Sequence, residues 1–248
     1  MIGSKMRWLM LLLLGMQLPQ LAVAQRKFPT EKSAIRDGFL FATGEPVRIA
    51  VFPPDSEVSE MNAAGMALPD AKATDAARVA LIQSLQNDPS FPHAKWVVIE
   101  PKAADALPAL ASQRALFQLV VDAAIRHHLF ATEPLPSKQG QFQWSLGKGM
   151  SDYIAQTNAT YGLFIYTRDS RNSAGKTAMQ ALATALGNRA ERGKHMGYAG
   201  LVDLKSGELV WLNVNLKMSP DLETGAGANL RLKQLLRGFP ATNSGQGK

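Results

Sequence analysis

Residues 161–167 read YGLFIYT and contain almost no polar side chain. A strand that is buried on both faces appears as a continuous apolar run, whereas a strand at the surface of a sheet alternates apolar and polar residues. We therefore predict that residues 161–167 form a central strand with other elements packed on both of its faces.

Two shorter apolar runs precede this segment. Residues 47–52 (VRIAVF) end at Pro53 and Pro54, and residues 96–99 (WVVI) end before Pro101. Prolines at these positions are typical of strand ends, so both runs are predicted strands. Residues 55–72 are predicted to be a loop. Helices are predicted over 75–87 with Thr74 as N-cap, over 112–130, near 145–157 and over 177–186, from their apolar spacing.

The residues after 195 indicate a hairpin followed by a helix. Segments 196–204 and 209–217 are predicted strands joined by a short Gly-containing turn. Along the second strand, the apolar residues that begin at Val210 alternate with a second set that begins at Trp211. This alternation predicts that one face of the strand lies in the core and the other faces solvent or a partner. Leu232, Leu235, Leu236 and Phe239 share one face of a predicted helix over 229–239.

These elements predict an α/β fold. Alternating strands and helices favour parallel strands joined by crossovers, and the late hairpin adds antiparallel strands. We expect a single three-layer domain over 46–239, with a mixed sheet of about five strands, helices on both faces and a C-terminal β-hairpin plus helix. Residues 25–45 are expected to be an N-terminal arm and residues 240–248 a disordered tail.

The N-terminal residues have the form of a secretory signal peptide. Lys5 and Arg7 precede an apolar run, and the small residues Ala22 and Ala24 fit a cleavage site after Ala24. The prediction is a cleaved signal and a periplasmic protein; retention of the segment as a membrane anchor is the alternative. The chain contains no Cys, so it cannot be lipidated like a bacterial lipoprotein. No later segment has the length of a transmembrane span.

Composition excludes several classes of protein. A hydrophobic content of 46% and a charged content of 19% exclude a wholly disordered chain. The absence of Cys excludes thiol nucleophiles and zinc sites built on Cys. The net charge falls from +7 to +5 without residues 1–24, because Lys5 and Arg7 are removed. For an exported protein, this basicity favours anionic lipid headgroups or envelope polymers over nucleic acid as partners.

Two motifs invite a cofactor interpretation, and neither has the residues that the cofactor needs. Gly175, Lys176 and Thr177 resemble the end of a phosphate-binding loop, but Ser170 stands where that loop requires Gly. His127 and His128 are adjacent, so on a helix they point about 100° apart and do not share a metal-binding face. We expect no catalytic residues, no metal and no cofactor.

The candidate interaction surface combines charged residues after the central strand with the polar face of the last strand. Its members are Arg168, Asp169, Arg171, Lys176, Trp211, Asn213 and Asn215. Trp211 has two interpretations: the last helix covers it, or it marks an interface.

Two segments resemble known bacterial envelope proteins. Residues 48–55 (RIAVFPPD), with Ser59 and Glu60, resemble the opening of envelope proteins of the lipoprotein kind. Residues 200–211 (GLVDLKSGELVW) are similar to a hairpin of the curli-secretion lipoprotein and penicillin-binding-protein activator group, whose fold is similar to the N-terminal domain of TolB. The resemblance covers most of 46–237 and departs from that group in lacking the lipidated Cys.

The resemblance and the predicted export together favour a non-enzymatic periplasmic accessory or interaction protein in cell-envelope assembly or secretion, with envelope proteins as partners. The alternatives are an exported hydrolase, or a periplasmic protein that binds a small ligand or an anion.

Overall fold

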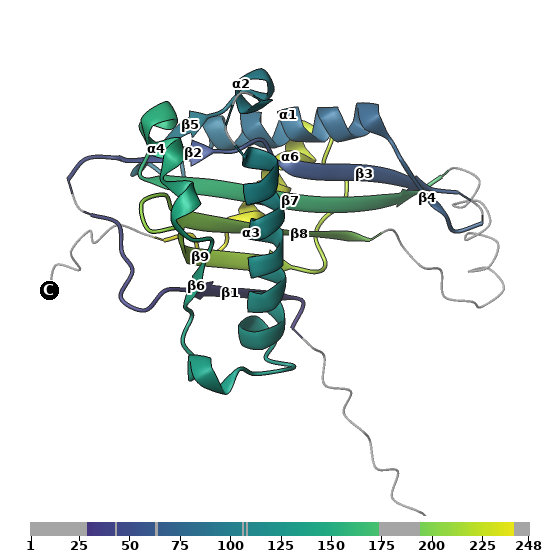
Figure 1. The fold of residues 1–248 in the computed structure, drawn as a ribbon. Coiled ribbons are helices and arrows are strands. Elements are labelled where there is room, and N and C mark those ends of the chain that lie inside the picture. The colour runs from purple at the N-terminus through teal and green to yellow at the C-terminus, as the bar shows by residue number, and fades with distance from the viewer. Residues whose placement is uncertain are drawn as a thin grey trace, which may run out of the picture.

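The computed structural model describes residues 29–42, 44–62, 64–105, 107, 109–173 and 194–240. These residues form one mixed sheet with helices on both faces (Figure 1). The predicted signal peptide, Lys176, the predicted helix over 177–186 and residues 241–248 lie outside the described residues.

The long strand β7 (Tyr161–Asn172) lies at the centre of the sheet, as its sequence predicts. The main strand order is β1-β9-β8-β7-β2-β5. The strands on this path are β1 (Glu31–Ile35), β2 (Val47–Val51), β5 (Ala94–Val98), β7, β8 (His195–Asp203) and β9 (Glu208–Asn215). β2 is parallel to both β5 and β7, whereas β8 and β9 form the predicted antiparallel hairpin. Gly207 in the hairpin turn has a φ of 74°, a conformation that favours glycine.

The prediction of about five strands is wrong, because the described residues form a sheet of nine. The five expected strands are present, and β1, β3 (Asp55–Met61), β4 (Ala67–Pro69) and β6 (Trp144–Ser145) are added to them. β3 and β4 occupy the predicted loop over 55–72, and β1 turns the predicted arm into a strand at the edge of the sheet.

The polar composition of β3 explains why its sequence does not predict a strand. The segment reads DSEVSEM, and Val58 is its only buried apolar residue. β3 is parallel to the last seven residues of β7. The strand β7 is long enough to pair with β2 at its start and with β3, which follows the two prolines, along the rest of its length. Backbone pairing with β7 therefore forms this strand without an alternating apolar pattern.

Helices cover both faces of the sheet, which confirms the three-layer prediction (Figure 1). α1 (Ala71–Asn87) and α6 (Gly225–Leu235) pack on one face. α3 (Leu110–Ala124), continued by a π-helical turn over Ile125–Leu129, packs on the other face with α4 (Asp152–Thr157). The shorter helices are α2 (Pro101–Asp105) and two 3-10 turns at Pro136–Lys138 and Lys148–Met150.

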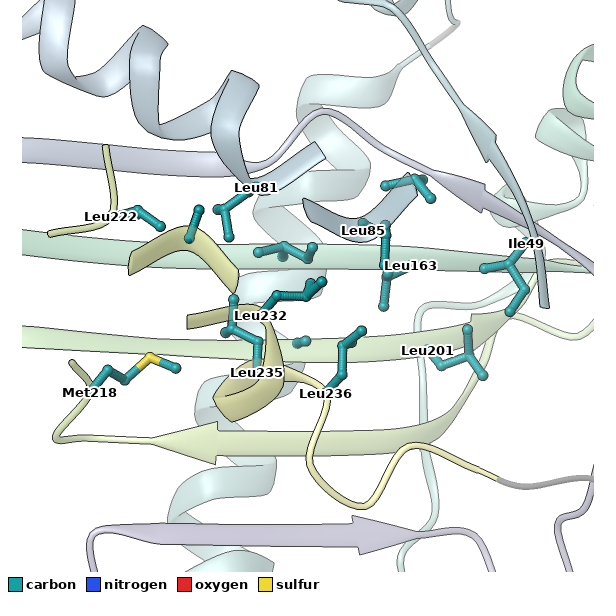
Figure 2. Close-up of a cluster of buried hydrophobic side chains, with 14 of the residues drawn as sticks. Ile49, Leu81, Leu85, Leu163, Leu201, Met218, Leu222, Leu232, Leu235 and Leu236 are labelled. Atoms are coloured by element: carbon teal, nitrogen blue, oxygen red, sulfur yellow. The ribbon is translucent and has the colours of Figure 1, made fainter. Parts of the chain in front are cut away.

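Each face has its own apolar core. Figure 2 shows the core beneath α1 and α6, where Leu81 and Leu85 meet Leu232, Leu235 and Leu236 over the sheet. The predicted apolar face with Leu232 and Leu235 is the buried face of α6, but the helix spans Gly225–Leu235 rather than 229–239, so Leu236 and Phe239 follow its end. Within the described residues, no helix is both long and apolar enough to cross a membrane.

The predicted N-cap of α1 is wrong by one turn. Asp70 caps the helix, because its side chain accepts a hydrogen bond from the Ala73 amide at 2.9 Å. Thr74 lies inside the helix, where its hydroxyl accepts a hydrogen bond from the Val58 amide of β3 at 2.9 Å. Thr74 therefore joins α1 to a strand that the sequence does not predict.

Candidate functional site

Charged residues gather at two places in the fold, and we name each by its residues. The charged end of β7 consists of Asp169, Arg171, His195, Glu223 and Arg231. The edge groove is a cavity of about 700 Å³ between the end of β1 and the segment 138–145. The first place contains two of the predicted surface residues, and the second contains none of them.

A buried ionic cluster lies at the centre of the charged end of β7. The Arg231 guanidinium donates to both oxygens of Asp169, at 2.9 and 2.6 Å, and it is fully buried. His195 Nδ1 lies 2.8 Å from Asp169 Oδ1, so it donates to the carboxylate. Arg231 comes from α6, Asp169 from β7 and His195 from β8, so the cluster joins the helix to the sheet.

Arg171 forms a second link at the same end. Its guanidinium donates to Glu223 at 2.7 Å and to Asp70, the N-cap of α1, at 2.6 Å. Together with His195 and Asp169, it borders a cavity of about 260 Å³. The guanidinium is held by two carboxylates, one next to each helix N-terminus, so this side chain fixes the starts of α1 and α6 on the sheet.

Arg168 points to the opposite face of β7. It forms an ion pair with Asp55 at 2.9 Å and lies 4.0 Å from the centre of the Tyr166 ring. Tyr166 stacks on Tyr198 with ring centres 4.4 Å apart, and burial raises the pKa of the Tyr198 hydroxyl. Arg168 and Arg171 therefore belong to different faces of the protein, and they do not form one surface.

Trp211, Asn213 and Asn215 are buried, which corrects their predicted placement on a surface, and Lys176 lies outside the described residues. Trp211 is fully buried, and its ring meets Phe239 edge-on with centres 5.2 Å apart. Asn213 donates through its side-chain amide to the backbone carbonyls of Gln234 and Leu235, at 2.8 and 3.0 Å. Asn215 is 4% exposed. The end of α6 covers this strand face, and the Asn213 side chain on it caps the helix backbone.

The two adjacent histidines lie in the π-helical turn after α3. His127 bonds to the backbone carbonyl of Glu133, and the His128 ring lies near Phe142, with burial lowering the pKa of His128. In the part of the chain that the structure describes, no group of three or more His, Asp or Glu side chains is placed to hold a metal ion.

The edge groove brings together aromatic, amide and charged side chains from distant segments. Its lining residues are Arg36, Asp37, Lys138, Gln141, Phe142, Gln143, Trp144, Ser145, Glu208 and Leu209. Arg36 pairs with Glu208, and Lys138 Nζ lies 4.8 Å from the centre of the Trp144 ring. The same ammonium donates to the Gln143 carbonyl at 2.6 Å, so Trp144 and Gln143 are held in place before any ligand arrives.

One charged group of the groove keeps free bonding capacity. Among the described residues, the Asp37 carboxylate forms no ion pair, whereas Trp144 Nε1 lacks a hydrogen-bond partner but is buried. The sequence does not predict this site, because Arg36 and Asp37 fall in the predicted arm and Trp144 lies just before the helix predicted near 145–157. Two aromatic residues, Phe142 and Trp144, that alternate with glutamines in a polar segment are the one signal that could have indicated it.

No protein-family model matches this sequence, and no curated protein matches it. The fold is similar to two structures of the PelC dodecamer from Paraburkholderia phytofirmans, each with a TM-score of 0.39. The identities are 14% and 13%, over 86% and 85% of this chain and 98% of PelC. Because the TM-score is below 0.5, we base the proposed function on the residues of this chain.

Proposed function

We propose that this chain is a non-enzymatic periplasmic protein of the cell envelope, which acts in assembly or secretion by binding a partner protein. The observation that carries the proposal is the edge groove, whose volume of about 700 Å³ lies in the range of ligand-binding pockets. The signal-like N-terminus and the resemblance of residues 48–55 and 200–211 to envelope proteins support the location.

The groove has the composition of a binding site. Trp and Arg are enriched in protein interfaces, because they combine apolar area with hydrogen-bond donors. Trp144 and Arg36 provide these groups, and the side chains of Gln141 and Gln143 add amide donors and acceptors beside them. Lys138 holds Trp144 in place, and Glu208 holds Arg36. Binding therefore costs less side-chain conformational entropy.

The Asp169–His195 pair is the feature nearest to an enzyme's acid–base pair, and its surroundings favour a structural role. Both oxygens of Asp169 are already bonded to the buried guanidinium of Arg231. Removing one partner of a buried ion pair costs about 3–5 kcal/mol, because the other charge stays buried without a partner. Asp169 therefore needs Arg231 to stay folded and is not free to exchange protons.

A comparison of partners recovered by matched variants tests the proposal. The mature protein is used to recover proteins from chemically cross-linked envelopes, beside the groove variant Gln141→Lys and the control Gln83→Lys on the exposed face of α1. We expect at least one protein that the wild type and the control recover and the groove variant loses. Recovery of the same proteins by all three forms, or of none by any form, would contradict a binding function of the groove.

A further inference from the structure

The strand β1, next to the edge groove, offers unpaired backbone groups along the edge of the sheet. Among the described residues, β1 pairs with β9 alone, and it lies along the lower edge of the sheet in Figure 1. The Arg36 amide donates to the Val210 carbonyl at 2.9 Å, and the Thr30 carbonyl accepts from the Leu216 amide at 2.7 Å. The even-numbered residues of this segment therefore face β9.

In an antiparallel ladder, residues alternate between bonding to the neighbouring strand and pointing away from it. The backbone N–H and C=O groups of Glu31, Ser33 and Ile35 consequently point away from the sheet. Ser33 is exposed, and the side chain of Ile35 is an exposed apolar group at the same edge. These groups form a short row of donors and acceptors that have no partner in the part of the chain that the structure describes, with the exposed Ile35 side chain beside it.

The charged side chains of β1 do not block this row. Lys32 donates through Nζ to the Leu129 carbonyl, and Glu31 pairs with Arg237 of the segment after α6. Both are held against the faces of the sheet, so neither extends beyond its edge. No proline lies within Glu31–Ile35, whereas β4 ends in Pro69 and β5 carries the exposed Lys95 between Pro92 and Pro101. Lysine and proline are the residues that protect sheet edges from further pairing.

The edge of β1 continues directly into the edge groove. Arg36 and Asp37 follow β1 in the chain and line the groove, and β6 pairs with β9 on the far side of it. Main-chain pairing with an edge strand supplies affinity in strand-addition complexes, and adjoining pockets supply specificity. In this protein the edge strand β1 and the edge groove lie in one line along the edge of the sheet.

We propose that β1 and the edge groove together bind an extended segment of a partner protein, which adds as a further strand beside β1. An extended polypeptide alone among the common envelope ligands carries N–H and C=O groups at the spacing of a strand, so it matches Glu31, Ser33 and Ile35. An apolar residue of the segment faces Ile35. The polar residue that follows enters the groove, between Asp37 and the amides of Gln141 and Gln143.

This inference rests on the proposed function and names the class of partner. The probe is a phage-displayed library of random dodecapeptides, selected against the mature protein. A selected peptide is then added to the protein, and amide hydrogen exchange is followed residue by residue. Ser33 and Ile35 should exchange fast in the free protein and slowly with the peptide, whereas Lys32 and Ala34 should be protected in both states.

Matched variants separate strand addition from other modes of binding. Ser33→Pro removes one outward N–H and should weaken the selected peptides by about tenfold or more, whereas Ser33→Ala keeps the N–H and should bind normally. The exchange measurement on the wild-type protein decides the question if Ser33→Pro does not fold.

Peptides that bind without protecting Ser33 and Ile35 would overturn strand addition. Protection of these amides in the peptide-free protein that increases with protein concentration would overturn it as well, because a second copy would then occupy the edge. Either result can occur while the variant Gln141→Lys still fails to recover the envelope partner of the wild type. The proposed function then stands, and only binding by strand addition is refuted.

Discussion

The charged end of β7 and the edge groove use the same residue types in opposite ways. Arg231 and Asp169 have side chains that are 0% and 6% exposed, whereas those of Arg36 and Glu208 are 36% and 44% exposed. At the first place the Asp169–Arg231 pair is enclosed by partners from several elements, and Arg171 at its border, 42% exposed, reaches the surface. At the second place the ion pair borders open space, and the Asp37 carboxylate beside it forms no ion pair among the described residues.

The difference separates charges that hold the fold from charges that can meet a ligand. A buried ion pair that loses one member leaves an uncompensated charge in the protein interior, which is strongly destabilising. An exposed ion pair contributes little to stability, because water and salt screen it. Changes at the charged end of β7 should therefore lower stability, and changes at the edge groove should lower binding.

Deletion of residues 229–248 should have the largest effect. It removes Leu232, Leu235 and Leu236, which are 1%, 0% and 3% exposed, together with Arg231. Burial of each leucine contributes about 1.5–3 kcal/mol, and a domain has a total stability of about 5–15 kcal/mol. We expect no cooperative thermal transition by circular dichroism. The exposed substitution Lys233→Ala is the control, and a deletion variant that melts like its parent would refute the three-layer architecture.

Arg231→Met should destabilise the protein by about 3–5 kcal/mol, because it leaves Asp169 buried without its guanidinium. Urea unfolding measures the loss. The double variant Asp169→Asn with Arg231→Met should recover part of the stability, since no buried charge remains unpaired. Equal stability of the single variant and the wild type would show that the pair does not hold α6 on the sheet.

Trp211→Ala should cost about 3–5 kcal/mol, as expected for a large aromatic side chain removed from a core. Urea unfolding of this variant measures the loss, and it decides between the two interpretations of Trp211 that the sequence leaves open. Unchanged stability together with loss of an envelope partner would support an interface at Trp211, against the burial beneath Phe239.

Arg36→Ala should have the smallest effect on stability, about 0–1 kcal/mol, because its ion pair with Glu208 is exposed. Its effect should instead appear in binding, as weaker retention of the envelope partner. The thermal midpoint of the purified variant and the amount of partner recovered are measured in parallel. A large fall in the midpoint without a change in recovery would place Arg36 among the structural charges.

The sequence predicts the parts of the fold whose side chains alternate or run in apolar blocks. The strands β2, β5, β7, β8 and β9 and the buried face of α6 all have such patterns. β3 escapes prediction, because its polar residues DSEVSEM are held in the sheet by backbone pairing with β7. β1 escapes for the same reason: its residues EKSAI show no apolar period, and the pairing with β9 lies far away in the sequence.

The candidate site depends on long-range contacts that no local pattern contains. Arg36 and Glu208 are 172 positions apart in the chain and meet only because β1 and β9 are neighbours. Asn213 is polar in a strand whose alternation suggests an exposed face, yet its amide bonds to the end of α6. Polar side chains in a strand can therefore indicate a capped helix rather than a surface, and sequence spacing alone does not separate the two cases.

Site-specific photo-cross-linking in cells shows which of the two places meets a partner. A photoreactive amino acid is placed at Gln141 in the edge groove and, in a second strain, at Asp221, an exposed residue that lines the cavity beside the charged end of β7. We expect a discrete cross-linked partner at Gln141 and none at Asp221. A partner captured at Asp221 and absent at Gln141 would contradict this expectation, because the charged end of β7 would then be the binding surface.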